Sequence, residues 1–109
     1  MIQVYNPESI SILEPLFSHG TTLLWFSAPW CGTCRAIKRV LMTYDQAYPT
    51  NIIEINVDTD KNLVNLYRIQ GVPALIILKN GIVVDRIGGS LDYEEFIAWL
   101  KINECIDKI

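Results

Sequence analysis

The sequence of 109 residues lacks several features that would place it in a specialised class of protein. Its 9 lysines and arginines are outnumbered by 12 aspartates and glutamates, and the net charge of −3 gives no general attraction for nucleic acid or anionic lipid. The longest apolar run, residues 74–78, is far shorter than the ~20 residues that span a bilayer. Composition therefore disfavours nucleic-acid binding, binding to a membrane surface and a membrane span.

Low-complexity segments and targeting signals are also missing. The 6 glycines and 5 prolines are scattered, and no segment repeats another, so the sequence predicts neither a linker nor a repeat architecture. The first residues, MIQVYNPESI, have neither the basic start nor the apolar core of a secretory signal. We therefore expect a single domain over residues 1–109, located in the cytoplasm.

Cysteine is scarce, and Cys31, Cys34 and Cys105 are too few and too odd in number for a disulfide framework. A close pair can supply half of a zinc or iron–sulfur site, but the further ligands would have to be Cys105 and His19, which form no second close pair. We therefore expect no bound metal. Cys105 is placed off the apolar face of the last predicted helix and is interpreted as a spare thiol, and His19 as a solvated side chain.

Apolar periodicity predicts strands and helices that alternate along the chain. Strands are expected over residues 2–5, 22–27, 52–57, 75–78 and 82–87. Helices are expected over residues 11–19, 34–48, 63–67 and around 96–102. Asn80 and Gly81 predict a tight hairpin between the last two strands. The order predicts an α/β fold, a central mixed sheet of about five strands flanked on both faces by about four helices.

Cys31 and Cys34 stand two residues apart where a predicted strand passes into a predicted helix. Such a pair can close a small disulfide and reopen it, which is a redox function. The free N–H groups at a helix start stabilise a thiolate at Cys31, so we expect Cys31 to be the exposed nucleophile. We expect Cys34, one turn further in, to be more buried and to resolve the mixed disulfide between Cys31 and a substrate.

Residues 26–35, FSAPWCGTCR, resemble the active-site motif of the thioredoxin family. Other segments that resemble this family follow in order over nearly the whole chain: Asn56-Val57-Asp58 at a strand end, Gly71-Val72-Pro73 as the cis-proline loop, Lys79-Asn80-Gly81 in the closing hairpin, and Gly88-Gly89 as the glycine turn. The resemblance implies the thioredoxin fold. It also implies a thiol–disulfide oxidoreductase that reduces protein disulfides through a Cys31/Cys34 dithiol–disulfide cycle.

The resemblance further implies how substrates bind and how the pair is recharged. A cis peptide bond before Pro73 would let the backbone of Val72 bind a substrate peptide as an added strand. The implied substrate-binding residues are Trp30, Gly32, Thr33, Val72, Pro73, Gly88 and Gly89. Electrons would come from NADPH through a separate thioredoxin-reductase-like donor, because the chain has no dinucleotide-binding fingerprint of its own. We expect a monomer with no bound cofactor.

Three of the positions that depart from the family pattern bear on the chemistry of the cysteine pair. Thr33 stands where proline is usual, and its N–H and hydroxyl near the Cys31 sulfur would make the pair more oxidising. Trp25 stands where the family usually has a buried aspartate that helps to deprotonate the resolving thiol, and Glu54 stands where that aspartate has its lysine partner. Two interpretations of Glu54 stay open: a base for Cys34 across the same pocket, or a strand-end carboxylate that reaches solvent.

Two other functions are compatible with the same residues. The fold could act as a weak thiol oxidant or isomerase, because the residues between the cysteines set the redox potential. It could also be a partner-binding module in which redox activity is secondary. The presence of both cysteines together with Trp30 and Pro73 favours an enzyme over that module.

Overall fold

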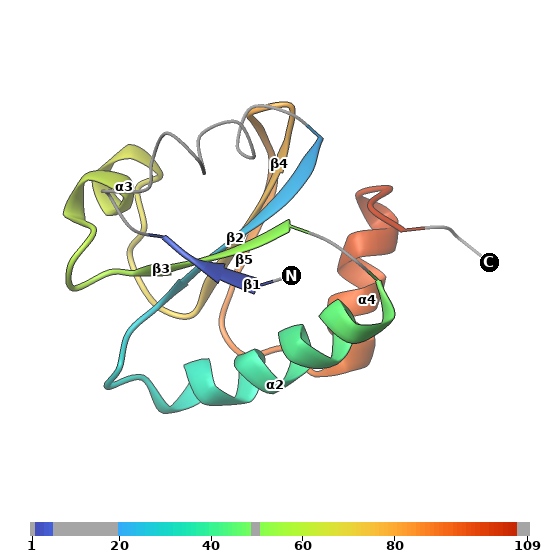
Figure 1. The fold of residues 1–109 in the computed structure, drawn as a ribbon, viewed down its shortest axis with the longest axis horizontal. Helices are drawn as coiled ribbons and strands as arrows, with labels where there is room; N and C mark the ends of the chain where they lie inside the picture. The colour runs from blue at the N-terminus through green and yellow to red at the C-terminus, as the bar shows by residue number, and fades with distance from the viewer. Residues whose placement is uncertain (1, 6–19, 49–50, 107–109) are drawn as a thin grey trace.

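The computed structural model describes residues 2–5, 20–48 and 51–106. The elements of this part of the chain, shown in Figure 1, are β1 (Ile2–Val4), β2 (Thr21–Ser27), α2 (Gly32–Ala47), β3 (Asn51–Asn56), α3 (Lys61–Leu66), β4 (Ala74–Lys79), β5 (Ile82–Gly88) and α4 (Tyr93–Ile102). The five predicted strands and three of the predicted helices are confirmed. The remaining prediction, a helix over residues 11–19, lies outside the described residues, as does His19.

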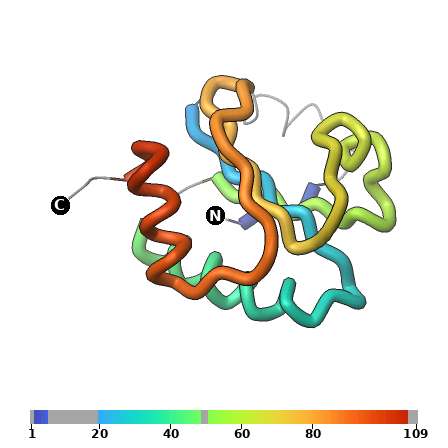
Figure 2. Tube along the Cα trace, turned by 180° about the vertical axis from the view of Figure 1, so that it is seen from behind, coloured from blue at the N-terminus to red at the C-terminus, as the bar shows by residue number. Residues whose placement is uncertain are grey.

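The strands form one mixed sheet in the order β1-β3-β2-β4-β5. β1, β3 and β2 run parallel, whereas β4 pairs antiparallel with both β2 and β5. Helices α2 and α4 lie on one face of the sheet and α3 on the other, as Figures 1 and 2 show from opposite sides. This arrangement confirms the predicted α/β fold.

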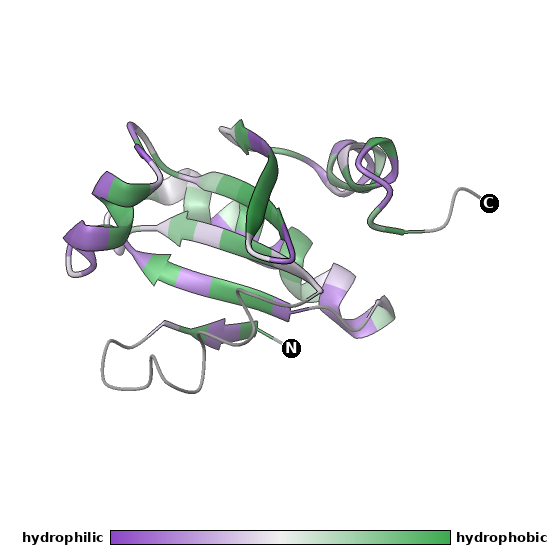
Figure 3. Cartoon of the chain, turned by 90° about the horizontal axis from the view of Figure 1, so that it is seen from above, coloured by the Kyte–Doolittle hydropathy of each residue, from purple (hydrophilic) through white to green (hydrophobic). Residues whose placement is uncertain are grey.

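Two hydrophobic clusters fill the space between the sheet and the helices. The first joins β2, β3 and β4 to α2 and α4 and includes Leu23, Trp25, Ile37, Leu41 and Phe96. The second lies on the α3 face and includes Leu24, Phe26, Ile53, Ile55 and Ile76. Strands β2 and β4, in the middle of the sheet, are covered on both faces, which explains their unbroken apolar runs over residues 23–26 and 74–78 (Figure 3).

The β4–β5 hairpin turns at the predicted dipeptide. Asn80 and Gly81 have φ angles of 53° and 82°, the pair of positive values that a type I′ turn requires. The side chain of Asn80 also accepts a hydrogen bond from the backbone N–H of Gly20 at 2.9 Å. The hairpin is therefore tied to the start of β2, and it carries β5 back toward the loop before β4.

The prediction for Cys105 is wrong in its placement. Helix α4 ends at Ile102, so Cys105 lies in the turn beyond the helix, where it is half-buried against the first hydrophobic cluster. Its Sγ lies 3.7 Å from the carbonyl oxygen of Asn103, and burial raises the pKa of the thiol although Lys79 opposes this effect. Cys105 is therefore part of the packing below α4 and belongs to a different cluster from the cysteine pair.

Candidate active site

The cysteine pair lies at the start of α2, just beyond the C-terminal end of the middle strand β2. Cys31 is the N-cap residue, in an extended conformation with φ −89° and ψ 109°. Its Sγ accepts a hydrogen bond from the backbone N–H of Cys34 at 3.1 Å. Ile37, Leu41 and Tyr44 anchor the helix in the core, so the capping position of Cys31 is set by helix packing.

Cys31 and Cys34 form a disulfide, with their Cα atoms 5.3 Å apart. The expectation that Cys31 is exposed is wrong, because 6% of Cys31 and 4% of Cys34 is accessible to solvent. Ala28, Val57 and Val72 pack around both residues and cover them to nearly the same extent. These apolar side chains therefore shield the sulfur atoms of the pair from solvent.

Thr33 lies beside the sulfur of Cys31. Its Oγ1 is 3.4 Å from Cys31 Sγ, where the hydroxyl can donate a hydrogen bond to a thiolate. Gly32 and Thr33 are both exposed at the first turn of α2. The hydroxyl thus has the position that the sequence predicted for it.

Trp30 projects into solvent next to the pair, with 68% of its surface exposed. Its indole Nε1 donates to both carboxylate oxygens of Asp58, at 3.1 and 3.3 Å. The backbone N–H of Asp58 in turn donates to Asn56 Oδ1 at 2.8 Å. Sequence reasoning noted Asp58 only as part of a strand-end motif. No signal in the sequence marks Asp58 as the partner of Trp30, because an exposed indole N–H can equally donate to water and needs no acceptor within the protein.

The loop before β4 lies against the cysteines. The Val72–Pro73 peptide bond is cis, as predicted, and Val72 packs on the pair. Gly89, at φ 88°, donates its backbone N–H to the carbonyl oxygen of Pro73 at 3.1 Å, and Gly88 lies opposite Ala74 in the strand register. The structure therefore places Val72 against the cysteine pair and joins the glycine turn to Pro73.

A cavity of about 220 Å³ lies behind the pair, between α2 and the parallel strands. Its walls include Cys34, the indole of Trp25, and the polar residues Ser27, Arg35, Lys38, Glu54 and Asn56. Half-buried Glu54 accepts a hydrogen bond from the hydroxyl of Ser27, whose Oγ lies 3.1 Å from Oε2. The buried Nε1 of Trp25 has no acceptor in the described part of the chain.

Sequence reasoning missed Ser27, although strand alternation carries a signal for it. Trp25 and Ser27 share one face of β2, and Glu54 and Asn56 lie opposite them in the parallel register of β3. Both strands therefore direct polar side chains toward α2 at the ends where Cys34 lies.

Among the residues that the structure describes, no three histidine, cysteine, aspartate or glutamate side chains gather as metal ligands. None of the described helices is long and apolar enough to span a bilayer.

The disulfide joins the N-cap cysteine of α2 to the cysteine three residues further on, and it lies beside a cis-proline loop. This arrangement is that of a thiol–disulfide oxidoreductase. The comparisons with known proteins agree. The thioredoxin family model, described as "Thioredoxin", matches residues 11–102, and the chain belongs to this family. Its redox-active pair makes it a thioredoxin-type oxidoreductase that acts on protein disulfides.

Individual relatives support the same assignment. The chain is 39% identical over 74 residues to thioredoxin of Bacillus subtilis, an alignment that covers 66% of this chain and 71% of that protein. It is 36% identical over 95 residues to thioredoxin of Chlorobaculum thiosulfatiphilum, covering 85% and 86%. The crystal structure of reduced Schistosoma mansoni thioredoxin pre-protein superimposes with a TM-score of 0.79, at 22% identity over 93% of this chain and 96% of that one, and shows the same fold.

Proposed function

We propose that Cys31 is the nucleophile and Cys34 the resolving residue of this oxidoreductase. The Cys31 thiolate attacks one sulfur of a substrate disulfide, forming a mixed disulfide and releasing the other substrate sulfur, which takes up a proton. Cys34, as a thiolate, then attacks Cys31 Sγ, closing the Cys31–Cys34 disulfide and releasing the second substrate sulfur. The observation that carries this assignment is the N–H of Cys34 directed at Cys31 Sγ at 3.1 Å, which stabilises negative charge on Cys31.

The resolving step needs a base, and we propose Glu54 for it. Cys34 is buried and loses its proton before it attacks, a step that apolar surroundings slow. Glu54 lines the same cavity as Cys34, and the hydrogen bond from Ser27 occupies only one of its carboxylate oxygens. The cavity is wide enough for a water molecule. Glu54 would take the proton of Cys34 directly or through one water.

The substitution Glu54→Gln tests this role. We expect it to slow the resolving step by roughly ten- to a hundredfold, the lower part of the range for general acid–base catalysis, while mixed-disulfide formation stays nearly unchanged. Stopped-flow kinetics separates the two steps. Glu94→Gln, which makes the same charge change on an exposed residue of α4, is the matched control. If both steps run at the normal rate in Glu54→Gln, Glu54 is only a strand-end carboxylate.

We also propose the surface that receives substrates. Val72 would pair its backbone with an extended substrate segment next to the cysteines, as in other cases of strand addition. The residues of this proposed substrate surface are Trp30, Gly32, Thr33, Val72, Pro73, Gly88 and Gly89. Supporting the proposal, Val72 packs on the pair and the glycine turn is hydrogen-bonded to Pro73.

The proposed setting is the cytoplasm, where residues 1–109 would act as a single monomeric domain in cell redox homeostasis. Its partners would be disulfide-containing proteins and a thioredoxin-reductase-like donor that passes electrons from NADPH. No cofactor other than the redox-active disulfide would be bound.

A second candidate function is a more oxidising member of the family, a weak thiol oxidant or isomerase. The observation that favours it is the Thr33 hydroxyl 3.4 Å from Cys31 Sγ. Stabilising the thiolate stabilises the reduced form, and this raises the reduction potential of the pair. A redox titration against glutathione distinguishes the two functions.

A further inference from the structure

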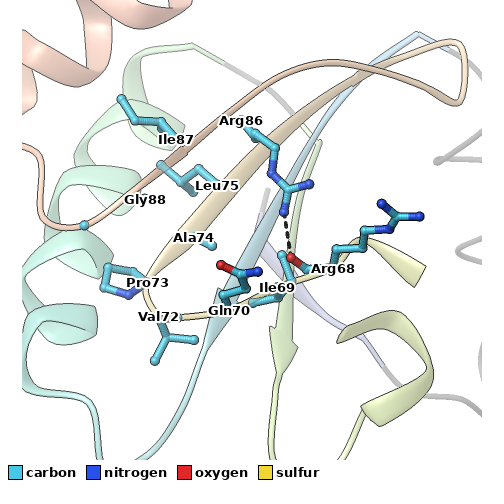
Figure 4. Close-up of a pocket in the computed structure, with 12 residues that line it drawn as sticks. Arg68, Ile69, Gln70, Val72, Pro73, Ala74, Leu75, Arg86, Ile87 and Gly88 are labelled. Carbon is cyan, nitrogen blue, oxygen red and sulfur yellow. Dashed lines mark hydrogen bonds between the residues drawn. The ribbon is translucent and has the colours of Figure 1, made fainter. Parts of the chain in front are cut away.

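A second cavity, of about 480 Å³, lies between β5 and the loop that leads from α3 into β4. Figure 4 shows it in close-up. Its lining shares Val72, Pro73, Gly88 and Gly89 with the proposed substrate surface and continues away from the cysteines toward Arg68, Gln70 and Arg86. A polypeptide bound at Val72 would therefore run directly into this cavity.

The charge of the cavity is opposite to that of the whole chain. Among residues 2–5, 20–48 and 51–106, two arginines and no carboxylate line it, although the net charge of the protein is −3. Strand alternation keeps Asp85 out of the cavity, because Asp85 and Arg86 project from opposite faces of β5. The carboxylate of Asp85 accepts hydrogen bonds from Trp99 and Asn103 of the α4 region, both at 2.9 Å. Within the described part of the chain, no carboxylate lines the cavity to balance the charge of Arg68 and Arg86.

Arg86 is held in place by the loop. Its Nη2 donates to the carbonyl oxygen of Tyr67 at 2.7 Å and to that of Arg68 at 3.3 Å, and Figure 4 shows the guanidinium directed at this part of the loop. These bonds use one nitrogen of the guanidinium and leave Nη1 and Nε to bind another acceptor. Arg68 is exposed, and within the described residues its side chain makes no hydrogen bond.

We propose that this cavity binds an acidic side chain of the substrate polypeptide, so that the protein favours disulfides flanked by aspartate or glutamate. The proposal rests on the proposed function, in which Val72 pairs with a substrate strand. Gln70 lies two residues before Val72, and an extended chain advances ~3.3 Å per residue. We therefore place the acidic residue two to four positions along the substrate polypeptide from the substrate cysteine. A carboxylate there matches the planar donors of arginine.

The expected preference is modest because both arginines are exposed. Exposed ion pairs of this kind give about a two- to fivefold effect, and added salt weakens it. The preference should thus be largest at low ionic strength and decline as salt is added.

The experiment compares two disulfide-linked peptides that differ only by Glu or Gln at these flanking positions. Reduction rates are measured for the wild-type chain, Arg68→Glu and Lys61→Glu. Lys61 lies on α3 outside the cavity, so the control changes the net charge equally. We expect the wild type and Lys61→Glu to reduce the Glu peptide two- to fivefold faster, and Arg68→Glu to lose or invert this preference while reducing the Gln peptide normally.

Equal rates on both peptides by the wild type, or a preference that Arg68→Glu leaves intact, would overturn the proposal while the proposed function stands. Failure to reduce either peptide would instead count against the proposed function. In that case binding of the same peptides with serine in place of cysteine, measured by fluorescence anisotropy, still decides the issue. Tighter binding of the Glu peptide that Arg68→Glu abolishes supports the acidic site, and equal binding refutes it.

Discussion

The hydroxyl of Thr33 should set the redox potential of the cysteine pair. In the structure it lies 3.4 Å from Cys31 Sγ, next to the Cys34 N–H that already donates to the same sulfur. The substitution Thr33→Val removes the hydroxyl and keeps the branched shape of the side chain, so the start of α2 is preserved. Thr33→Ser retains the hydroxyl and is the matched control.

The expected shift follows from the strength of one hydrogen bond to a thiolate. Hydrogen bonds to charged groups contribute about 1.5–3 kcal/mol, and the long distance and exposed position of Thr33 reduce this to about 1 kcal/mol. For a two-electron couple, 1.4 kcal/mol corresponds to about 30 mV. Thr33→Val should therefore lower the reduction potential by about 20 mV, roughly a fivefold change in the exchange equilibrium constant.

A titration in glutathione buffers measures this shift directly. We expect Thr33→Val and Thr33→Pro to be more reducing than the wild type, and Thr33→Ser to remain close to it. Replacement by proline also removes a backbone N–H near the thiolate, which acts in the same direction. A potential that stays constant or rises in Thr33→Val would show that the hydroxyl does not stabilise the thiolate.

Two further predictions concern Cys31 and Asp85. In the reduced protein, Cys31 should be the first thiol alkylated by substoichiometric iodoacetamide, because its thiolate is stabilised at the helix start; peptide mass spectrometry showing faster labelling of Cys34 or Cys105 would contradict this. The hydrogen bond from Asn103 is the main reason that the pKa of the Asp85 carboxyl lies below its usual value. The ionised carboxylate therefore stabilises the fold at pH values above the pKa of Asp85 in the unfolded chain, and this stabilisation is lost as the pH falls through its pKa in the folded protein. Asp85→Asn should lower the free energy of unfolding by about 1 kcal/mol at neutral pH and by less under acid conditions; urea unfolding showing the same difference at both pH values would refute the linkage.

Features that depend on local sequence could be predicted without the structure. The strand before the cysteines, the helix after them and the Asn80–Gly81 turn each follow from a short pattern of residues. The cis bond before Pro73 followed from family resemblance, since no periodicity indicates it.

Features that depend on the pairing of distant segments could not be predicted in this way. The near-equal burial of Cys31 and Cys34 results from Val57 and Val72, which arrive from two other parts of the chain. The bond between Arg86 and the loop at Tyr67 requires the register of β5. Without that register, the face on which each charged side chain lies is undetermined, because a shift of one residue reverses it.

Covalent trapping tests the central claim most directly, namely that Cys31 attacks the substrate and Cys34 resolves the product. The Cys34→Ser variant, incubated with a disulfide-containing protein such as insulin, should accumulate a mixed disulfide that mass spectrometry locates on Cys31. Cys31→Ser should neither trap substrate nor turn it over. A Cys31→Ser variant that reduced insulin at the normal rate, or a mixed disulfide located on Cys105, would contradict the account.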